Sequence, residues 1–152
     1  MKKYRKKGYT LIELVAVIAI LAILLGSGFT MVGILKKMKS EVELESAVYE
    51  VSSILSYAKA YCRKNSYEGV VVIDVVRNSI IFKYKVGNTS SVTVKSENLP
   101  NNIKIFSYGI NIIDVSNVGY LKNAGTILIN SGRKQKHITI AVGNDLITVK
   151  DE

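Results

Sequence analysis

The chain has 152 residues, which leaves room for one modest domain besides a membrane-spanning helix. Its formal net charge is +9, but five basic residues precede Gly8 and the remaining 16 basic and 12 acidic residues carry only +4, so the total charge is no argument for nucleic-acid binding. The single cysteine, Cys62, excludes an intrachain disulfide, and a packed core must supply the stability.

A basic leader precedes the longest apolar run of the chain. No charged residue lies between Leu14 and Leu35. As a helix rising ~1.5 Å per residue, this run spans about 33 Å, and the hydrocarbon core of a bilayer is about 30 Å thick. We predict one transmembrane helix over 9–35 with the leader on the cytoplasmic side and the C-terminal part across the cytoplasmic membrane. The leader charges are Lys2, Lys3, Arg5, Lys6 and Lys7.

One acidic residue, Glu13, stands at the beginning of this apolar run. An acidic side chain well inside a membrane helix costs roughly 2.5–3.5 kcal/mol on insertion scales. We therefore expect a positively charged partner for Glu13, and the nature of that partner bears on function.

Residues 36–65 have the pattern of an amphipathic helix. Their apolar residues recur largely at intervals of three and four, which predicts one apolar stripe. No Pro or Gly lies between Ile34 and Asn65, so we expect this helix to continue the membrane helix. Cys62 falls near the stripe and is expected to be a small core side chain. The stripe consists of Val42, Leu44, Ala47, Val48, Val51, Ile54, Leu55, Ala58 and Tyr61.

Beyond Ser66 the chain is rich in β-branched residues and turn signals. Gly143-Asn144 suits a two-residue hairpin turn, and the last three strands are expected to form a meander. Residues 107–124 give no clear prediction. The predicted strands are Val70–Asp74, Ser79–Val86, Ser91–Lys95, Ile103–Phe106, Thr126–Asn130, His137–Val142 and Leu146–Lys150.

The predicted fold class is α+β. A small antiparallel sheet with one apolar face, laid on the stripe of the long N-terminal helix, buries both surfaces. The chain then divides into a leader (1–8), a transmembrane helix (9–35), its amphipathic continuation (36–65) and a β domain (66–152).

The segment Lys7-Gly8-Tyr9-Thr10-Leu11-Ile12-Glu13-Leu14 resembles the class III signal of type IV pilins and pseudopilins. This family combines a basic leader, Gly, an aromatic residue or Met, Thr-Leu-Ile-Glu and an apolar helix. The resemblance implies cleavage after Gly8 by a prepilin peptidase and methylation of the new N-terminal Tyr9. It further implies that Glu13 pairs with the N-terminal amine of a neighbouring subunit, which relieves the burial cost of both charges.

Two later segments resemble the H-type minor pseudopilins and their competence-system counterparts. They are the helix end Ala58–Asn65 and the hairpin segment Gly125–Gly132. The implied function is that of a minor filament subunit that is not an enzyme and needs no cofactor. Its implied partners are the prepilin peptidase, other pilin-like subunits, an inner-membrane assembly platform and the cytoplasmic membrane.

Two other functions are compatible with the sequence. A basic cluster before an apolar run also occurs in signal anchors, which would make the chain a membrane-anchored extracellular binding domain that does not polymerise. The chain could instead be a DNA-binding competence pilin, with Arg133, Lys134 and Lys136 at a hairpin tip contacting phosphates. A solvated tip is the simpler interpretation of these three residues. The lone His137 and Cys62 form no pattern typical of a catalytic or metal site.

Overall fold

The computed structural model describes residues 10–87, 90–142 and 147–151. The leader, Gly8, Tyr9 and the predicted turn at Gly143-Asn144 lie outside these residues. The chain forms two compact units, and the boundary between them in sequence follows Lys39.

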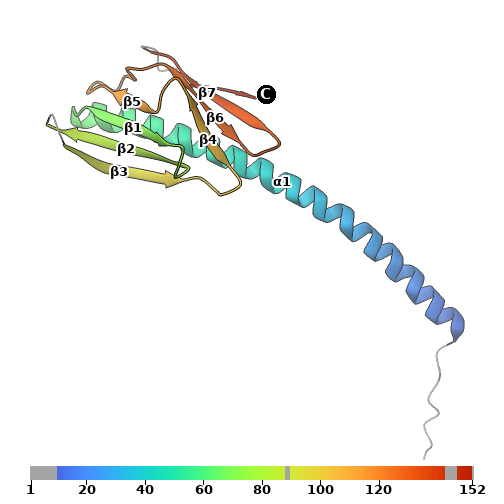
Figure 1. The fold of residues 1–152 in the computed structure, drawn as a ribbon. Helices are drawn as coiled ribbons and strands as arrows, with labels where there is room; N and C mark the ends of the chain where they lie inside the picture. Colours follow the sequence, from blue (N-terminus) through green and yellow to red (C-terminus); the bar gives the residue numbers. More distant parts are fainter. Residues whose placement is uncertain (1–9, 88–89, 143–146, 152) are drawn as a thin grey trace, which may run out of the picture. The chain divides into compact units, whose positions relative to one another are not determined.

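A single α-helix, α1, runs from Leu11 to Asn65 and belongs to both units (Figure 1). In the first unit the described side chains from Leu11 to Gly26 and from Met31 to Lys39 are all exposed. This is the one helix among the described residues that is long and apolar enough to cross a membrane, with a mean hydropathy of 2.5 in its most apolar window.

In the second unit α1 buries one face, as the apolar stripe predicts. Tyr61 is half-buried, but Val42 is 67% exposed, so its assignment to the stripe was wrong. Val42 lies two positions from the buried Leu44, about 200° around the helix, and therefore points the other way. The buried helix residues are Leu44, Ala47, Val48, Val51, Ile54, Leu55, Ala58 and Cys62.

Two four-stranded antiparallel sheets cover this face, where the sequence predicted one (Figure 1). The prediction of a long helix packed on antiparallel strands is confirmed. The first sheet has the order β3-β2-β1-β5 and the second the order β4-β6-β7-β8. The strands are β1 (Gly69–Asp74), β2 (Ser79–Val86), β3 (Ser90–Asn98), β4 (Lys104–Tyr108), β5 (Ile112–Val115), β6 (Gly125–Asn130), β7 (Gln135–Ile140) and β8 (Ile147–Asp151).

The chain passes from one sheet to the other after β3, after β4 and after β5. Strands β6, β7 and β8 form the expected meander, with Ile127 opposite Ile138 and Ile138 opposite Val149. Strand β5 was not predicted; it lies in 107–124 and extends the first sheet beside β1, where Ile113 pairs with Val71. Both residues are fully buried in the core that the helix and the two sheets share.

Asn78 links the two sheets at the point where the chain leaves the first one. It sits in the β1–β2 turn with φ 55°, a left-handed conformation that Asn tolerates. Its Nδ2 donates to the carbonyl of Ile103 at 2.7 Å, and its Oδ1 accepts from the N–H of Ile105 at 3.0 Å. Its own carbonyl accepts from Leu99 N–H at 3.0 Å, so this turn fixes the start of β4.

The C-terminal end of α1 turns sharply into β1. Ser66 has φ 55°, and the N–H of Tyr67 donates to the carbonyl of Cys62, which is the geometry of a Schellman C-cap. Gly69 then passes very close to the helix: a Cβ at that position would lie 2.7 Å from Cys62 Sγ and 2.8 Å from Phe82 Cε2. Only glycine fits this contact without movement of the core.

Candidate functional site

The N-terminal end of α1 is a capping box formed by Thr10 and Glu13. The Thr10 N–H donates to Glu13 Oε2 at 2.8 Å, and the Thr10 hydroxyl donates to the same oxygen at 3.0 Å. The Glu13 N–H lies 3.4 Å from Thr10 Oγ1 and 3.1 Å from the Thr10 carbonyl. A Thr followed three residues later by Glu satisfies otherwise unpaired N–H groups at a helix start. Thr10 and Glu13, which belong to the segment that resembles the processing signal, therefore also cap the start of the helix.

This cap leaves part of the Glu13 carboxylate accessible. Both side-chain bonds end on Oε2, and within the described part of the chain no hydrogen bond ends on Oε1. Glu13 is flanked by exposed apolar side chains, among them Leu11, which is 82% exposed, and Leu14, which is 58% exposed. The arrangement presents one negative charge on an apolar helix surface that has no cover within its own unit.

The predicted basic cluster lies at the β6–β7 hairpin, where the sequence placed it. Two of its cations reach the start of the second unit's helical segment: Lys134 Nζ lies 2.7 Å from Glu41 Oε1, and Lys136 forms an ion pair with Glu45. Arg133 is exposed and has no ion-pair partner among the described residues. The hairpin cations thus hold the hairpin on α1, and most of their charge is compensated.

The comparisons with known proteins agree with this geometry. Residues 3–29 match the model of the prokaryotic N-terminal methylation motif. The structure is similar to that of the minor pseudopilin EpsH from the type 2 secretion system of Vibrio cholerae, with a TM-score of 0.57 and 12% sequence identity over 72% of this chain and 96% of EpsH. The fold is pilin-like. No curated protein matches the sequence.

The methylation motif and the pilin-like fold together support assignment of the chain to the family of type IV pilins and type II pseudopilins. The match to the motif model spans Gly8, Tyr9 and Glu13, the three residues expected to act in processing and assembly. Gly8 and Tyr9 lie outside the described residues, and their roles stay predictions.

The helix start of the pilin-like domain carries three glutamates that sequence reasoning did not single out. Glu41 and Glu45 bind the hairpin lysines, and Glu43 accepts a hydrogen bond from Asn102 in the β3–β4 connection. The spacing Glu-x-Glu-x-Glu around the buried Leu44 is the signal that could have identified them. The three carboxylates fasten the β6–β7 hairpin and the β3–β4 connection to the same short stretch of α1.

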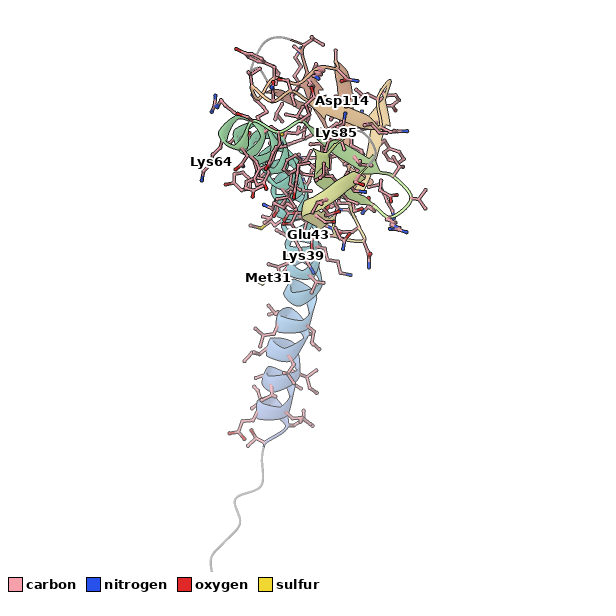
Figure 2. All side chains as sticks on the ribbon, turned by 90° about the vertical axis from the view of Figure 1, so that its left-hand side faces the viewer. Met31, Lys39, Glu43, Lys64, Lys85 and Asp114 are labelled. Atoms are coloured by element: carbon pink, nitrogen blue, oxygen red, sulfur yellow. The ribbon has the colours of Figure 1, made fainter. Side chains whose placement is uncertain are left out.

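A second set of ion pairs lies around β5: one joins β2 to β5, and the other joins the connection after β5 to the connection before β1. Lys85 Nζ lies 2.9 Å from Asp114 Oδ1, and Figure 2 shows these two side chains next to each other. Lys122 Nζ lies 2.6 Å from Glu68 Oε1, and this hydrogen bond lowers the pKa of Glu68. The hydrogen bond to Asp114 raises the pKa of Lys85. Each lysine keeps its charge against a carboxylate, as in a structural network.

Cys62 and His137 occupy structural positions. Cys62 is fully buried, and burial raises the pKa of its thiol to about 11, so it is present as the unreactive neutral form. His137 is half-buried in β7, between Leu128 on β6 and Lys150 on β8. Among the described residues no three His, Cys, Asp or Glu side chains gather in a way that could hold a metal ion.

Proposed function

We propose that this chain is a minor pilin or pseudopilin, a structural subunit without enzymatic activity that assembles into a type IV pilus-like filament for protein secretion, DNA uptake or adhesion. The observation that carries the proposal is the methylation motif over residues 3–29 on a pilin-like fold. Neither half alone is sufficient: a signal anchor explains an apolar helix, and a likeness at 12% identity shows only a fold.

In this proposal the basic leader holds the N-terminus in the cytoplasm and the pilin-like domain lies across the cytoplasmic membrane. A prepilin peptidase cuts after Gly8, and Tyr9 becomes the methylated N-terminus. An inner-membrane assembly platform then moves the subunit from the membrane into the filament, where other pilin-like subunits cover the exposed apolar helix.

Glu13 has two successive tasks in this sequence of events. In the single subunit its Oε2 caps the helix through Thr10, at 2.8 and 3.0 Å. In the filament its negative charge pairs with the positive N-terminal amine of a neighbouring subunit, created when the leader is removed. In a low-dielectric environment the pair offsets the cost of burying either charge alone.

The deciding experiment separates the charge of Glu13 from its capping function. Glu13→Gln keeps an acceptor for the Thr10 N–H, because Gln also serves at this position of a capping box, but it removes the charge. We expect Glu13→Gln and Glu13→Ala to insert into the membrane normally and to be absent from sheared filaments, measured by immunoblotting of membrane and filament fractions.

Glu50→Gln is the matched control, since Glu50 lies on the same helix outside the apolar run, and it should assemble normally. Assembly of Glu13→Gln at the level of the natural chain would leave Glu13 only a helix cap and would refute the charge pairing. Absence of the natural chain itself from the filament fraction would favour the non-polymerising anchor. Intact mass analysis of the N-terminus tests processing independently: the expected mature chain begins with methylated Tyr9.

The contacts of the β6–β7 hairpin do not favour DNA binding by this hairpin, which the alternative function of a competence pilin would require. Two of the three hairpin cations, Lys134 and Lys136, are paired with Glu41 and Glu45. A phosphate would have to displace these carboxylates. Arg133 is the remaining cation for such a contact.

A further inference from the structure

Aromatic side chains gather where the end of α1 meets β2. Tyr57 and Tyr61 lie one helical turn apart, and Tyr61 is 5.6 Å from Phe82 and 6.0 Å from Tyr84, measured between ring centroids. Tyr67, in the connection to β1, stacks on Tyr84 at 5.3 Å with an interplanar angle of 15°. The rings form one continuous band from the helix across the strand to the connecting loop.

Core packing explains only part of this aromatic band. Phe82 is fully buried and contacts both helix tyrosines edge-on. Tyr57 and Tyr67, at the two ends of the band, are 40% and 48% exposed. Exposed contiguous aromatic surface mostly marks a place where another molecule binds.

A groove of about 320 Å³ opens along the helix side of the band, lined by Tyr57, Ala60, Tyr61, Lys64 and Asn65. No carboxylate lines it, and the chain contains no acidic residue from Val51 to Tyr67. Lys64 lies at the end of the helix and points outward in Figure 2.

Lys95 supplies a second cation from β3. Its Nζ lies 5.8 Å from the centroid of the Tyr57 ring, and its ion pair with Glu97 is long, at 3.8 Å. The groove therefore combines aromatic rings with the positive charge of Lys64, and Lys95 adds a second positive charge beside Tyr57, one of the lining residues.

We propose that this groove binds single-stranded nucleic acid. Stacking of unpaired bases on exposed aromatic rings, with lysines along the phosphates, is how sequence-independent single-strand sites are built. A duplex keeps its bases stacked on one another and offers only phosphates to the groove. A neutral polysaccharide would leave the two lysines without a counter-charge. The site is separate from the hairpin cluster and does not depend on filament assembly.

The test uses the full chain in non-ionic detergent micelles and a short fluorescein-labelled oligonucleotide of mixed sequence, followed by fluorescence anisotropy. We expect binding of the single strand, clearly weaker binding of the same sequence as a duplex, and roughly a tenfold loss of affinity for Tyr57→Ala. Tyr57→Phe should bind as the natural chain does. Lys64→Gln should reduce the salt dependence of log K by about 0.7.

Tyr49→Ala is the matched control, because Tyr49 lies on the same helix and is 75% exposed but is outside the groove. It should leave affinity unchanged, and circular dichroism must show that each variant is folded. Equal affinity for single strand and duplex, equal competition by dextran sulfate, or unchanged binding by Tyr57→Ala would overturn the proposal. Loss of binding in Arg133→Ala but not in Tyr57→Ala would move the site to the hairpin. Absence of binding would refute this inference and leave the filament proposal untouched.

Discussion

Replacing Asn78 by Ala should destabilise the pilin-like domain strongly, although the residue lies in a surface turn. The substitution removes the bonds to Ile103 O at 2.7 Å and from Ile105 N–H at 3.0 Å. Two such bonds contribute about 1 kcal/mol each, and the N–H of the buried Ile105 loses its acceptor. Ala in the left-handed conformation adds roughly 1 kcal/mol. The expected loss is about 3 kcal/mol, or a fall in Tm of about 12 °C at roughly 4 °C per kcal/mol.

The assay is urea and thermal unfolding, followed by far-UV circular dichroism, of a soluble fragment that begins at Ser40. Asn78→Gly separates the two causes: glycine accepts φ 55° freely, so its loss should be about 1 kcal/mol smaller than that of Asn78→Ala. Ser66→Gly is the matched control at the other described non-glycine position with φ 55°, and it should not destabilise. A loss below about 1 kcal/mol for Asn78→Ala would refute the idea that this side chain joins the two sheets.

Two further predictions concern the end of the helix. Gly69→Ala should lower the free energy of unfolding by about 1–3 kcal/mol, because the new Cβ meets Cys62 Sγ and Phe82. The double variant Gly69→Ala/Cys62→Ala should regain part of that loss in the unfolding assay. The Cys62 thiol, whose pKa burial raises to about 11, should not react with a thiol reagent at pH 8 until the domain unfolds. Because folding raises the pKa of this thiol from its ordinary value of 9.0 to about 11, burial of the neutral thiol contributes its full share of the folding free energy below pH 9. That share is lost as the pH rises toward 11. Rapid labelling of the folded chain at pH 8 would contradict the burial.

The helix and seven of the strands could be predicted because each has a local pattern. Spacings of three and four identify the buried face from Leu44 to Ala58, and β-branched runs identify strands such as β2. The division into two sheets has no local pattern. It depends on which strands find partners: β5, only four residues long, pairs with β1, and Asn78 fixes where β4 begins. Such long-range pairings are tertiary and cannot be read from periodicity.

The candidate functional residues were predictable to different degrees. The motif around Glu13 is contiguous in sequence, so its chemistry can be recognised without a structure. The hairpin cations were located correctly, but their partners Glu41 and Glu45 lie about ninety residues away, and only the fold brings them together. The aromatic band likewise joins residues from helix, loop and strand. Scattered tyrosines look like ordinary strand and core residues until the fold places them in one row.

The part of the helix in the second unit is acidic at its first end and basic at its last. Between Ser40 and Glu50 the helix has four acidic residues and no basic one; from Val51 to Asn65 it has three basic residues and no acidic one. At the first end, Glu41 and Glu45 form ion pairs with the hairpin lysines and so neutralise their charge. At the other end the basic residues of the last turn, Arg63 and Lys64, complement the helix dipole, which is worth only about 0.3–1 kcal/mol each. The interaction with the helix dipole explains the basic last turn, but it does not explain the exposed tyrosines beside Lys64 or the position of Lys95 of β3 over Tyr57. Aromatic faces and cations from separate elements converge on one groove, and this convergence is what the binding experiment with Tyr57→Ala and Lys64→Gln examines.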